Sequence, residues 1–259
     1  MPADVTQAPS ALHAETEGIR ERLRAVRERI DTACRSAGRD PGEVRLLPVS
    51  KTVSETRLRA AWVAGCRWLG ENKVQEAQRK WQALGDLPDL RWSIIGHLQT
   101  NKARDVARFA DEFQALDSIR LAEALERRLQ MEGRGLDVFV QVNTSGEASK
   151  FGLEPDAVPG FLRELKAFPA LRLKGLMTLA LFSSDADAVR DCFRCLHRLR
   201  ERTPGLDDAR ELSMGMSGDF ELAIAEGATV VRVGTAIFGA RPTRDSDYWP
   251  GEPSAGATG

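Results

Sequence analysis

Hydrophobic positions along the chain follow two alternating patterns. The first is helical, because Ile19, Leu23, Val26 and Ile30 recur at the spacing of one helix face. Short runs of apolar and β-branched residues then alternate with further helical patterns. These runs predict eight strands, at residues 44–50, 66–69, 91–95, 113–116, 136–142, 173–177, 211–213 and 229–233.

Eight strand–helix units predict a parallel sheet, because each return to a parallel strand needs a crossover. They favour closure into a single (β/α)8 barrel of the TIM type, an α/β fold with an extra N-terminal helix. An open doubly wound sheet is the alternative, and it usually carries a glycine-rich loop after its first strand. That segment here, residues 50–54, is SKTVS and contains no glycine.

Composition adds limits to this picture. The 259 residues suit one barrel domain, which we place at residues 1–241. The tail at 242–259 is rich in Pro, Gly, Ser and Asp, and we expect it to be disordered. The net charge of −1 gives no reason to expect a nucleic acid or an anionic membrane as partner. We recognise no signal peptide and no apolar run of membrane-spanning length, so we expect a cytoplasmic protein.

Two of the cysteines, Cys192 and Cys195, form a C-x-x-C pair, which can mark a metal or redox site. The pair lies within a helical pattern, and no second Cys or Cys/His pair complements it. We therefore expect two reduced thiols packed against the core.

Functional groups of a barrel gather where strands end and the following loops begin. Lys51 stands at the end of the first strand, at a partly desolvated mouth. Desolvation disfavours the ammonium form and so frees the amine as a nucleophile toward aldehydes. Most other lysines fall in helical or loop patterns that we expect to face solvent, and Lys174 lies near the start of its strand. A snorkelling surface lysine is the alternative at Lys51.

The loops after the last two strands have the residues of a phosphate site. Segment 214–218, MGMSG, precedes a helix, and its glycines let backbone N–H groups approach an anion. Ser217 adds a hydroxyl, and Gly234 and Thr235 supply the same materials on the adjacent loop. Each glycine alone could serve a turn, but neighbouring loops of this kind favour phosphate binding.

Arg232 lies between Val231 and Val233 in the last strand, so strict alternation points it into the barrel. A buried arginine needs a partner. An acidic side chain could serve, and so could the pyridine nitrogen of pyridoxal 5′-phosphate (PLP).

These segments resemble the pyridoxal phosphate homeostasis proteins, a family of PLP-binding barrels similar to the N-terminal domain of alanine racemase. The matching segments are LLPVSKTVS (46–54), GENKVQEAQ (70–78), WSIIGHLQTNK (92–102), VQVNTSGEASKFGL (140–153), LKGLMTL (173–179) and LSMGMSGDFELAIAEGATVVRVGTAIFGAR (212–241). They span nearly the whole chain in family order. Small departures, such as Lys73 and Ser93, do not touch the expected cofactor contacts.

The resemblance implies a role for each candidate residue. Lys51 would form a Schiff base with PLP, Asn72 would lie near the ring hydroxyl, and Arg232 would meet the pyridine nitrogen. The phosphate would be held by Ser217, Gly234 and Thr235. The ring would pack near Ile95, Met177 and Met214. His97 is expected to be a structural or loop residue and not a base.

The resemblance also separates a carrier from an enzyme. Related racemases add a C-terminal domain whose tyrosine serves as a second acid/base, whereas the single tyrosine of this chain, Tyr248, lies in the tail. Arg232 would keep the pyridine nitrogen unprotonated, which makes the ring a weaker electron sink. We therefore expect a non-catalytic, monomeric protein that carries and buffers PLP for PLP-dependent apo-enzymes. The alternatives are a weak PLP-dependent amino-acid racemase or lyase, and a barrel for another phosphorylated ligand.

Overall fold

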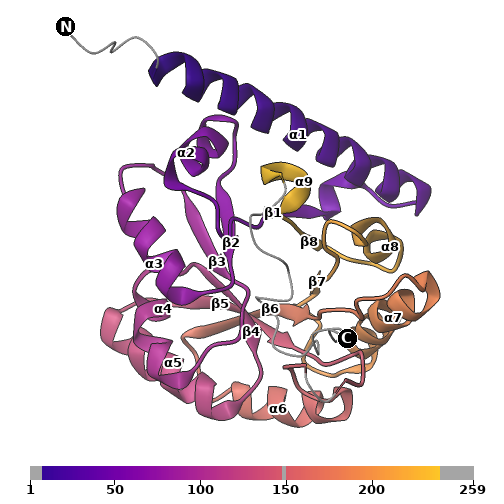
Figure 1. Cartoon of the computed structure of the whole chain (residues 1–259). Coiled ribbons are helices and arrows are strands. Elements are labelled where there is room, and N and C mark those ends of the chain that lie inside the picture. The colour runs from indigo at the N-terminus through magenta and orange to yellow at the C-terminus, as the bar shows by residue number, and fades with distance from the viewer. Residues whose placement is uncertain (1–7, 148–149, 240–259) are drawn as a thin grey trace, which may run out of the picture.

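A parallel sheet forms the centre of the molecule (Figure 1). The computed structural model describes residues 8–147 and 150–239. Its strands are β1 (Arg45–Pro48), β2 (Trp68–Glu71), β3 (Arg91–Ile94), β4 (Glu112–Leu116), β5 (Leu136–Gln141), β6 (Leu171–Met177), β7 (Glu211–Ser213) and β8 (Val230–Val233). The eight strands follow the order β1-β8-β7-β6-β5-β4-β3-β2, and all ladders are parallel.

The sheet curls until its two edge strands, β1 and β2, meet. A parallel bridge joins Val49 to Gly70, and the Ser50 amide donates to the Gly70 carbonyl across 2.9 Å. A Cβ at Gly70 would lie 3.3 Å from the side chain of Leu47, so the glycine leaves room for this approach. The result is a nearly closed (β/α)8 barrel, which confirms the fold predicted from the alternation of strands and helices.

Helices surround the barrel (Figure 1). They are α1 (Ala8–Ser36), α2 (Glu55–Val63), α3 (Val74–Ala83), α4 (Ala103–Phe109), α5 (Ile119–Glu132), α6 (Val158–Leu165), α7 (Ala186–Arg202), α8 (Phe220–Ala225) and α9 (Thr235–Phe238). Short 3-10 turns precede β1, α4 and α6, at Pro41–Glu43, Thr100–Lys102 and Pro155–Ala157. No helix in the described part of the chain is long and apolar enough to cross a membrane.

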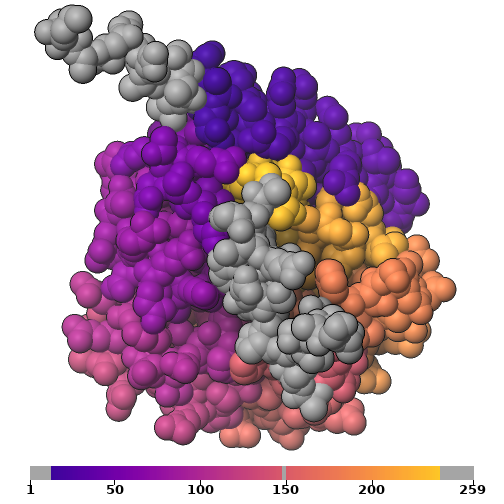
Figure 2. Space-filling model, viewed as in Figure 1, coloured from indigo at the N-terminus to yellow at the C-terminus, as the bar shows by residue number. Residues whose placement is uncertain are grey.

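The N-terminal helix α1 covers the side of the barrel where β1 and β8 meet. It packs against α2, α8 and α9, and Figure 2 shows it running past the yellow α9. The predicted stripe Ile19, Leu23, Val26 and Ile30 is buried, as the spacing required. The Nε of Arg22 also donates to the carbonyl of Ile237 in α9 across 2.6 Å.

Strand boundaries differ from the prediction by up to two residues. The second strand begins at Trp68 and not at Cys66, because the Cys66 amide still closes α2 by donating to the Ala61 carbonyl across 2.9 Å. Gly65 has a φ of 100°, which lets the chain turn out of the helix there. The expected boundary between barrel and tail, at residues 241 and 242, lies outside the described residues.

Candidate functional site

The candidate residues gather at one end of the barrel, because parallel strands all finish on the same side. The structure puts Lys51 after β1, Asn72 after β2, Ile95 after β3, Met177 at the end of β6, Met214 and Ser217 after β7, Arg232 in β8, Gly234 after it and Thr235 at the start of α9. Of these, Lys51, Met177, Met214, Arg232 and Gly234 are buried.

Lys51 lies in a tight turn, and the residue is only 5% exposed. The next residue, Thr52, has a φ of 65°, which is unfavourable for a β-branched side chain. Two hydrogen bonds hold this turn: the Thr52 amide donates to Glu76 Oε1 across 2.7 Å, and the Val53 amide donates to the Ser50 carbonyl across 3.0 Å. The backbone that carries Lys51 is therefore fixed from α3.

A second lysine supports the same turn from behind. Lys80 is completely buried, and its Nζ donates to the Ser50 carbonyl, Glu71 Oε1 and Glu76 Oε1, each across 2.7 Å. Our expectation that the helical lysines face solvent is wrong for Lys80, because it lies on the face of α3 that packs against the sheet. The three acceptors match the three N–H donors of an ammonium group.

Glu71 completes this buried cluster at the end of β2. Its Oε1 also accepts from the Ser50 hydroxyl across 2.6 Å, while its Oε2 has no hydrogen-bond partner in the described part of the chain. Burial raises the pKa of Glu71 to about 7, against the opposing charge of Lys80. Neither Glu71 nor Lys80 was predicted from the sequence to belong to the site.

Asn72 follows Glu71 and has unsatisfied hydrogen-bonding capacity. Its side-chain Oδ1 is buried, yet among the described residues it meets no donor. A Cβ at Gly96 would lie 2.2 Å from the Asn72 carbonyl, so only glycine fits beside it. An orphaned buried acceptor costs free energy unless a ligand or water satisfies it.

The loops after β7 and β8 are bonded to each other. The Gly234 amide donates to Ser217 Oγ across 3.3 Å. Gly215 has a φ of 91°, and a Cβ there would lie 2.6 Å from Ala223, so this glycine packs the loop against α8. A Cβ at Gly218, in contrast, would meet nothing within 4 Å. The loop at residues 214–218 therefore packs against α8 at Gly215, while the space beside Gly218 is open.

Arg232 is 3% exposed and points into the barrel, as the alternation predicted. Its Nη1 donates to Ser213 Oγ and its Nη2 to the Thr178 carbonyl, both across 2.7 Å. Neither acceptor is a carboxylate, so these two hydrogen bonds do not give Arg232 the acidic partner that was one alternative from the sequence. Burial lowers the pKa of Arg232 to about 10, and the charge of Asp219 partly opposes this, so the group stays protonated at neutral pH.

Two other candidates lie apart from these groups. His97 is exposed in the loop after β3, stacks on Phe151 with ring centroids 3.9 Å apart, and faces Asp117 across 3.5 Å. Cys192 and Cys195 lie in α7 as free thiols. No cluster of potential metal ligands occurs within residues 8–147 and 150–239.

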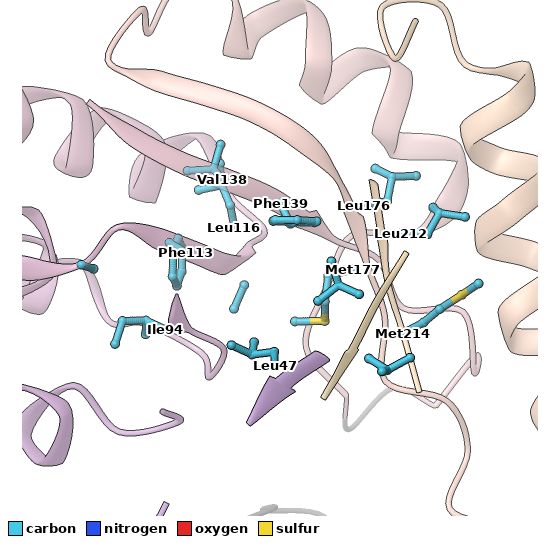
Figure 3. Close-up of a cluster of buried hydrophobic side chains, with 14 of the residues drawn as sticks. Leu47, Ile94, Phe113, Leu116, Val138, Phe139, Leu176, Met177, Leu212 and Met214 are labelled. Carbon is cyan, nitrogen blue, oxygen red and sulfur yellow. The ribbon is translucent and has the colours of Figure 1, made fainter. Parts of the chain in front are cut away.

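Ile95, Met177 and Met214 supply apolar side chains at this end of the barrel. The two methionines are fully buried and belong to the cluster of core side chains drawn in Figure 3, while Ile95 is half-buried against that core. A flat ring with an acceptor nitrogen, a hydroxyl and a phosphate would find matching groups here. The orphaned Oδ1 of Asn72 is the independent sign that a polar ligand group fits.

Comparison with known proteins decides the family. The family described as alanine racemase, N-terminal domain, matches residues 22–242. A pyridoxal phosphate homeostasis protein from Pseudomonas aeruginosa is 44% identical over 224 residues, which cover 86% of this chain and 96% of that protein. The chain belongs to the pyridoxal phosphate homeostasis protein family. A member from Escherichia coli is 40% identical over 230 residues, which cover 86% of this chain and 97% of that protein.

Solved structures agree with this membership. PipY from Synechococcus elongatus, solved with PLP bound, has a TM-score of 0.74 and 37% identity, and the match covers 85% of this chain and 100% of PipY. Alanine racemase from Corynebacterium glutamicum has a TM-score of 0.58 and 17% identity, with 85% of this chain and 62% of the racemase covered. The second likeness shows the shared barrel fold alone.

Proposed function

We propose that this family member binds PLP at the C-terminal end of the barrel and holds it as a Schiff base on Lys51. The relationship between β1 and β8 carries the proposal. These strands are neighbours, with Leu47 in register with Arg232, and the Val49 amide donates to the Val233 carbonyl across 2.9 Å. The chain therefore leaves both strands together, so the turn at Lys51 emerges beside the loop at Gly234.

Each group of PLP would then meet particular residues. The backbone and hydroxyl groups of Ser217, Gly234 and Thr235 would bind the phosphate, at the N-terminal ends of α8 and α9. The Arg232 guanidinium, which still has N–H groups to donate, would meet the ring nitrogen. Asn72 would satisfy its Oδ1 on the ring hydroxyl. Ile95, Met177 at the end of β6 and Met214 after β7 would pack near the ring.

Lys51 would supply the covalent link. Its amine would condense with the aldehyde of PLP, so that a C=N bond would replace the C=O bond and one water molecule would leave. The cofactor brings the aldehyde and the ring on which electrons can be delocalised. The link is reversible by hydrolysis, which is what release to another protein requires.

We further propose that the protein is a carrier and not an enzyme. Relatives at 36–44% identity are named homeostasis proteins, which supports this role. A protonated Arg232 beside the ring nitrogen would leave that nitrogen unprotonated, so the ring would stabilise carbanions poorly. Delivery to PLP-dependent apo-enzymes, a monomeric state and a cytoplasmic location stay predictions. A weak racemase or lyase activity is the second candidate, and D/L interconversion above a heat-inactivated control would support it.

The test is the absorbance spectrum of the purified protein with PLP, before and after borohydride, followed by peptide mapping. We expect an absorbance band at the edge of the visible range that borohydride removes, and we expect peptide mapping to find the reduced adduct on Lys51. The Lys51→Ala variant should lose that band at equal PLP, while Lys166→Ala, at an exposed position after α6, should keep it. A wild-type protein that binds no PLP would overturn the proposal and leave another phosphorylated ligand as the hypothesis.

A further inference from the structure

A line of buried polar side chains leads from Arg232 toward the opposite end of the barrel. Arg232 Nη1 donates to Ser213 Oγ across 2.7 Å, Ser213 Oγ bonds Gln114 Oε1 across 2.6 Å, and Gln114 Nε2 donates to Glu112 Oε1 across 2.6 Å. Each of the four side chains is at most 3% exposed. The line crosses the interior from β8 and β7 to β4, where apolar residues would otherwise be expected.

The chemistry of the two ends fixes the direction of every bond. A guanidinium only donates, so Ser213 Oγ must accept from Arg232 and can give its single proton only to Gln114. A carboxylate only accepts, so Gln114 must turn its NH2 toward Glu112 and its carbonyl toward Ser213. The orientation of the Gln114 amide is therefore determined by Ser213 on one side and Glu112 on the other. The line has one consistent arrangement of protons.

Glu112 anchors the far end of the line. Its Oε1 also accepts from the Ser93 hydroxyl, and its Oε2 accepts from Arg45 Nη2, each across 2.6 Å. Arg45 in turn lies 3.7 Å from Glu211 and over the ring of Trp68. These contacts hold the carboxylate that the Gln114 amide faces.

We propose that Gln114 is a positioning residue for PLP: through Ser213 it holds the Arg232 guanidinium in the orientation that meets the ring nitrogen. The proposal rests on the proposed PLP-binding function. Without an acceptor at position 114, the Ser213 hydroxyl could rotate its proton toward other acceptors and turn its lone pair away from Arg232. Arg232 would then keep one fixed bond, to the Thr178 carbonyl, and could swing about it.

The role of Gln114 differs from a contact with the ligand. Gln114 lies two side chains away from the proposed ring nitrogen, and its effect must pass through Ser213. A change at Gln114 or at Ser213 should therefore break the same line of hydrogen bonds. Changing both residues should weaken PLP binding no further than changing one of them. Residues that contribute independently would show effects that multiply.

The experiment measures the dissociation constants of two ligands, PLP and its 1-deaza analogue, which carries a ring CH in place of the nitrogen. The variants are Gln114→Met, Ser213→Ala and the double variant. We expect each single variant to bind PLP about tenfold more weakly, as loss of one charge-assisted bond implies. The double variant should bind PLP no more weakly than the weaker-binding single variant does. The affinity of all three variants for the deaza analogue should differ from that of the wild type by less than about twofold.

Two further variants separate positioning from a structural role. Ser93→Ala removes a bond of the same length to the same Glu112 oxygen but lies off the line, so its affinity for PLP should match the wild type. Ser213→Thr keeps a hydroxyl and should restore most of the affinity that Ser213→Ala loses. The Ser213 variants change few atoms, so they test the line even where Gln114→Met lowers the yield of folded protein.

The outcomes distinguish two failures. Wild-type protein that binds no PLP overturns the proposed function. Wild-type binding with PLP affinities that multiply in the double variant, or with equal losses for PLP and its deaza analogue, overturns the positioning role alone. Unchanged PLP affinity in folded Gln114→Met and Ser213→Ala would do the same.

Discussion

Lys80 donates from its Nζ to the carbonyl oxygen of Ser50 across 2.7 Å, directly before the proposed PLP-binding residue Lys51. The bond links α3 to the end of β1, so a fully buried cation supports the turn on which the proposed chemistry depends. Lys80 also neutralises part of the charge of Glu71 and Glu76. The first two predictions concern this cluster of Lys80, Glu71 and Glu76.

Replacing Lys80 with methionine should destabilise the protein strongly. The variant leaves Glu71 and the Ser50 carbonyl buried without their donor, and breaking a buried ion pair on one side costs about 3 kcal/mol or more. For a domain of this size, that loss corresponds to a fall of roughly 10 °C in Tm. Thermal unfolding of the protein without PLP is the measurement. The matched variant Lys166→Met, at an exposed lysine, should leave Tm nearly unchanged, and an equal fall in both would contradict the role of the buried cluster.

Glu71→Gln should change how stability depends on pH. Burial raises the pKa of Glu71 from 4.5 to about 7, so between these values the folded protein keeps a proton that the unfolded chain has released. The contribution of Glu71 to stability is therefore full below pH 4.5 and is lost as the pH rises through 7. Glutamine does not titrate, so the Tm of the variant minus that of wild type should increase from pH 5 to pH 8.

Asp86→Asn is the control for this titration. A hydrogen bond from Arg59 lowers the pKa of Asp86, so its titration lies below pH 5 in both states. The difference in Tm between Asp86→Asn and wild type should then stay constant from pH 5 to pH 8. A constant difference for Glu71→Gln as well would show that Glu71 is not the group with the raised pKa.

Thr52→Gly should stabilise the protein without PLP. Thr52 has a φ of 65°, and the left-handed conformation costs a β-branched residue about 1 kcal/mol or more. Glycine adopts this conformation freely, but it also makes the unfolded chain more flexible. The net gain in the free energy of unfolding should therefore be below about 1 kcal/mol. Urea unfolding measures it. Asp89 has a φ of 61°, but aspartate tolerates this region, so Asp89→Gly should gain less. A loss of stability in Thr52→Gly exceeding that in Asp89→Gly would contradict the strain.

The end of the barrel where the candidate residues gather was predictable from the sequence, and the cause is simple. Alternation assigns Arg232 to the interior, and the ends of apolar runs mark Lys51 and Gly234 as mouth residues. Both inferences use only local periodicity. The structure confirms the barrel and the inward arginine, while the ligand contacts of these residues stay predictions.

Side chains that depend on tertiary contacts were missed. Lys80 follows the buried Ala77 by three residues and precedes the buried Leu84 by four, so its place on the inner face of α3 was available from the spacing. Because a lysine carries a charge, it was expected to face solvent in spite of this spacing. The bond between Gln114 and Ser213 joins β4 and β7, which are not neighbours in the sheet. It depends on barrel closure and strand register, which local patterns do not determine.

Gly215 and Gly218 lie three residues apart in the same loop, and their alanine variants should fail in different ways. A Cβ at Gly215 would lie 2.6 Å from Ala223 and 2.9 Å from Phe220, on a backbone with a φ of 91°. Gly215→Ala should therefore lower the free energy of unfolding by roughly 2 kcal/mol or more.

Gly218→Ala should leave the fold intact, because its Cβ would meet no atom within 4 Å. If the proposed phosphate approaches this open side of the loop, the added methyl group should weaken PLP binding several-fold at an unchanged Tm. Thermal unfolding without PLP and PLP titration measure the two effects separately. Gly218→Ala protein with wild-type PLP affinity would move the phosphate away from this loop and toward Thr235, where α9 begins.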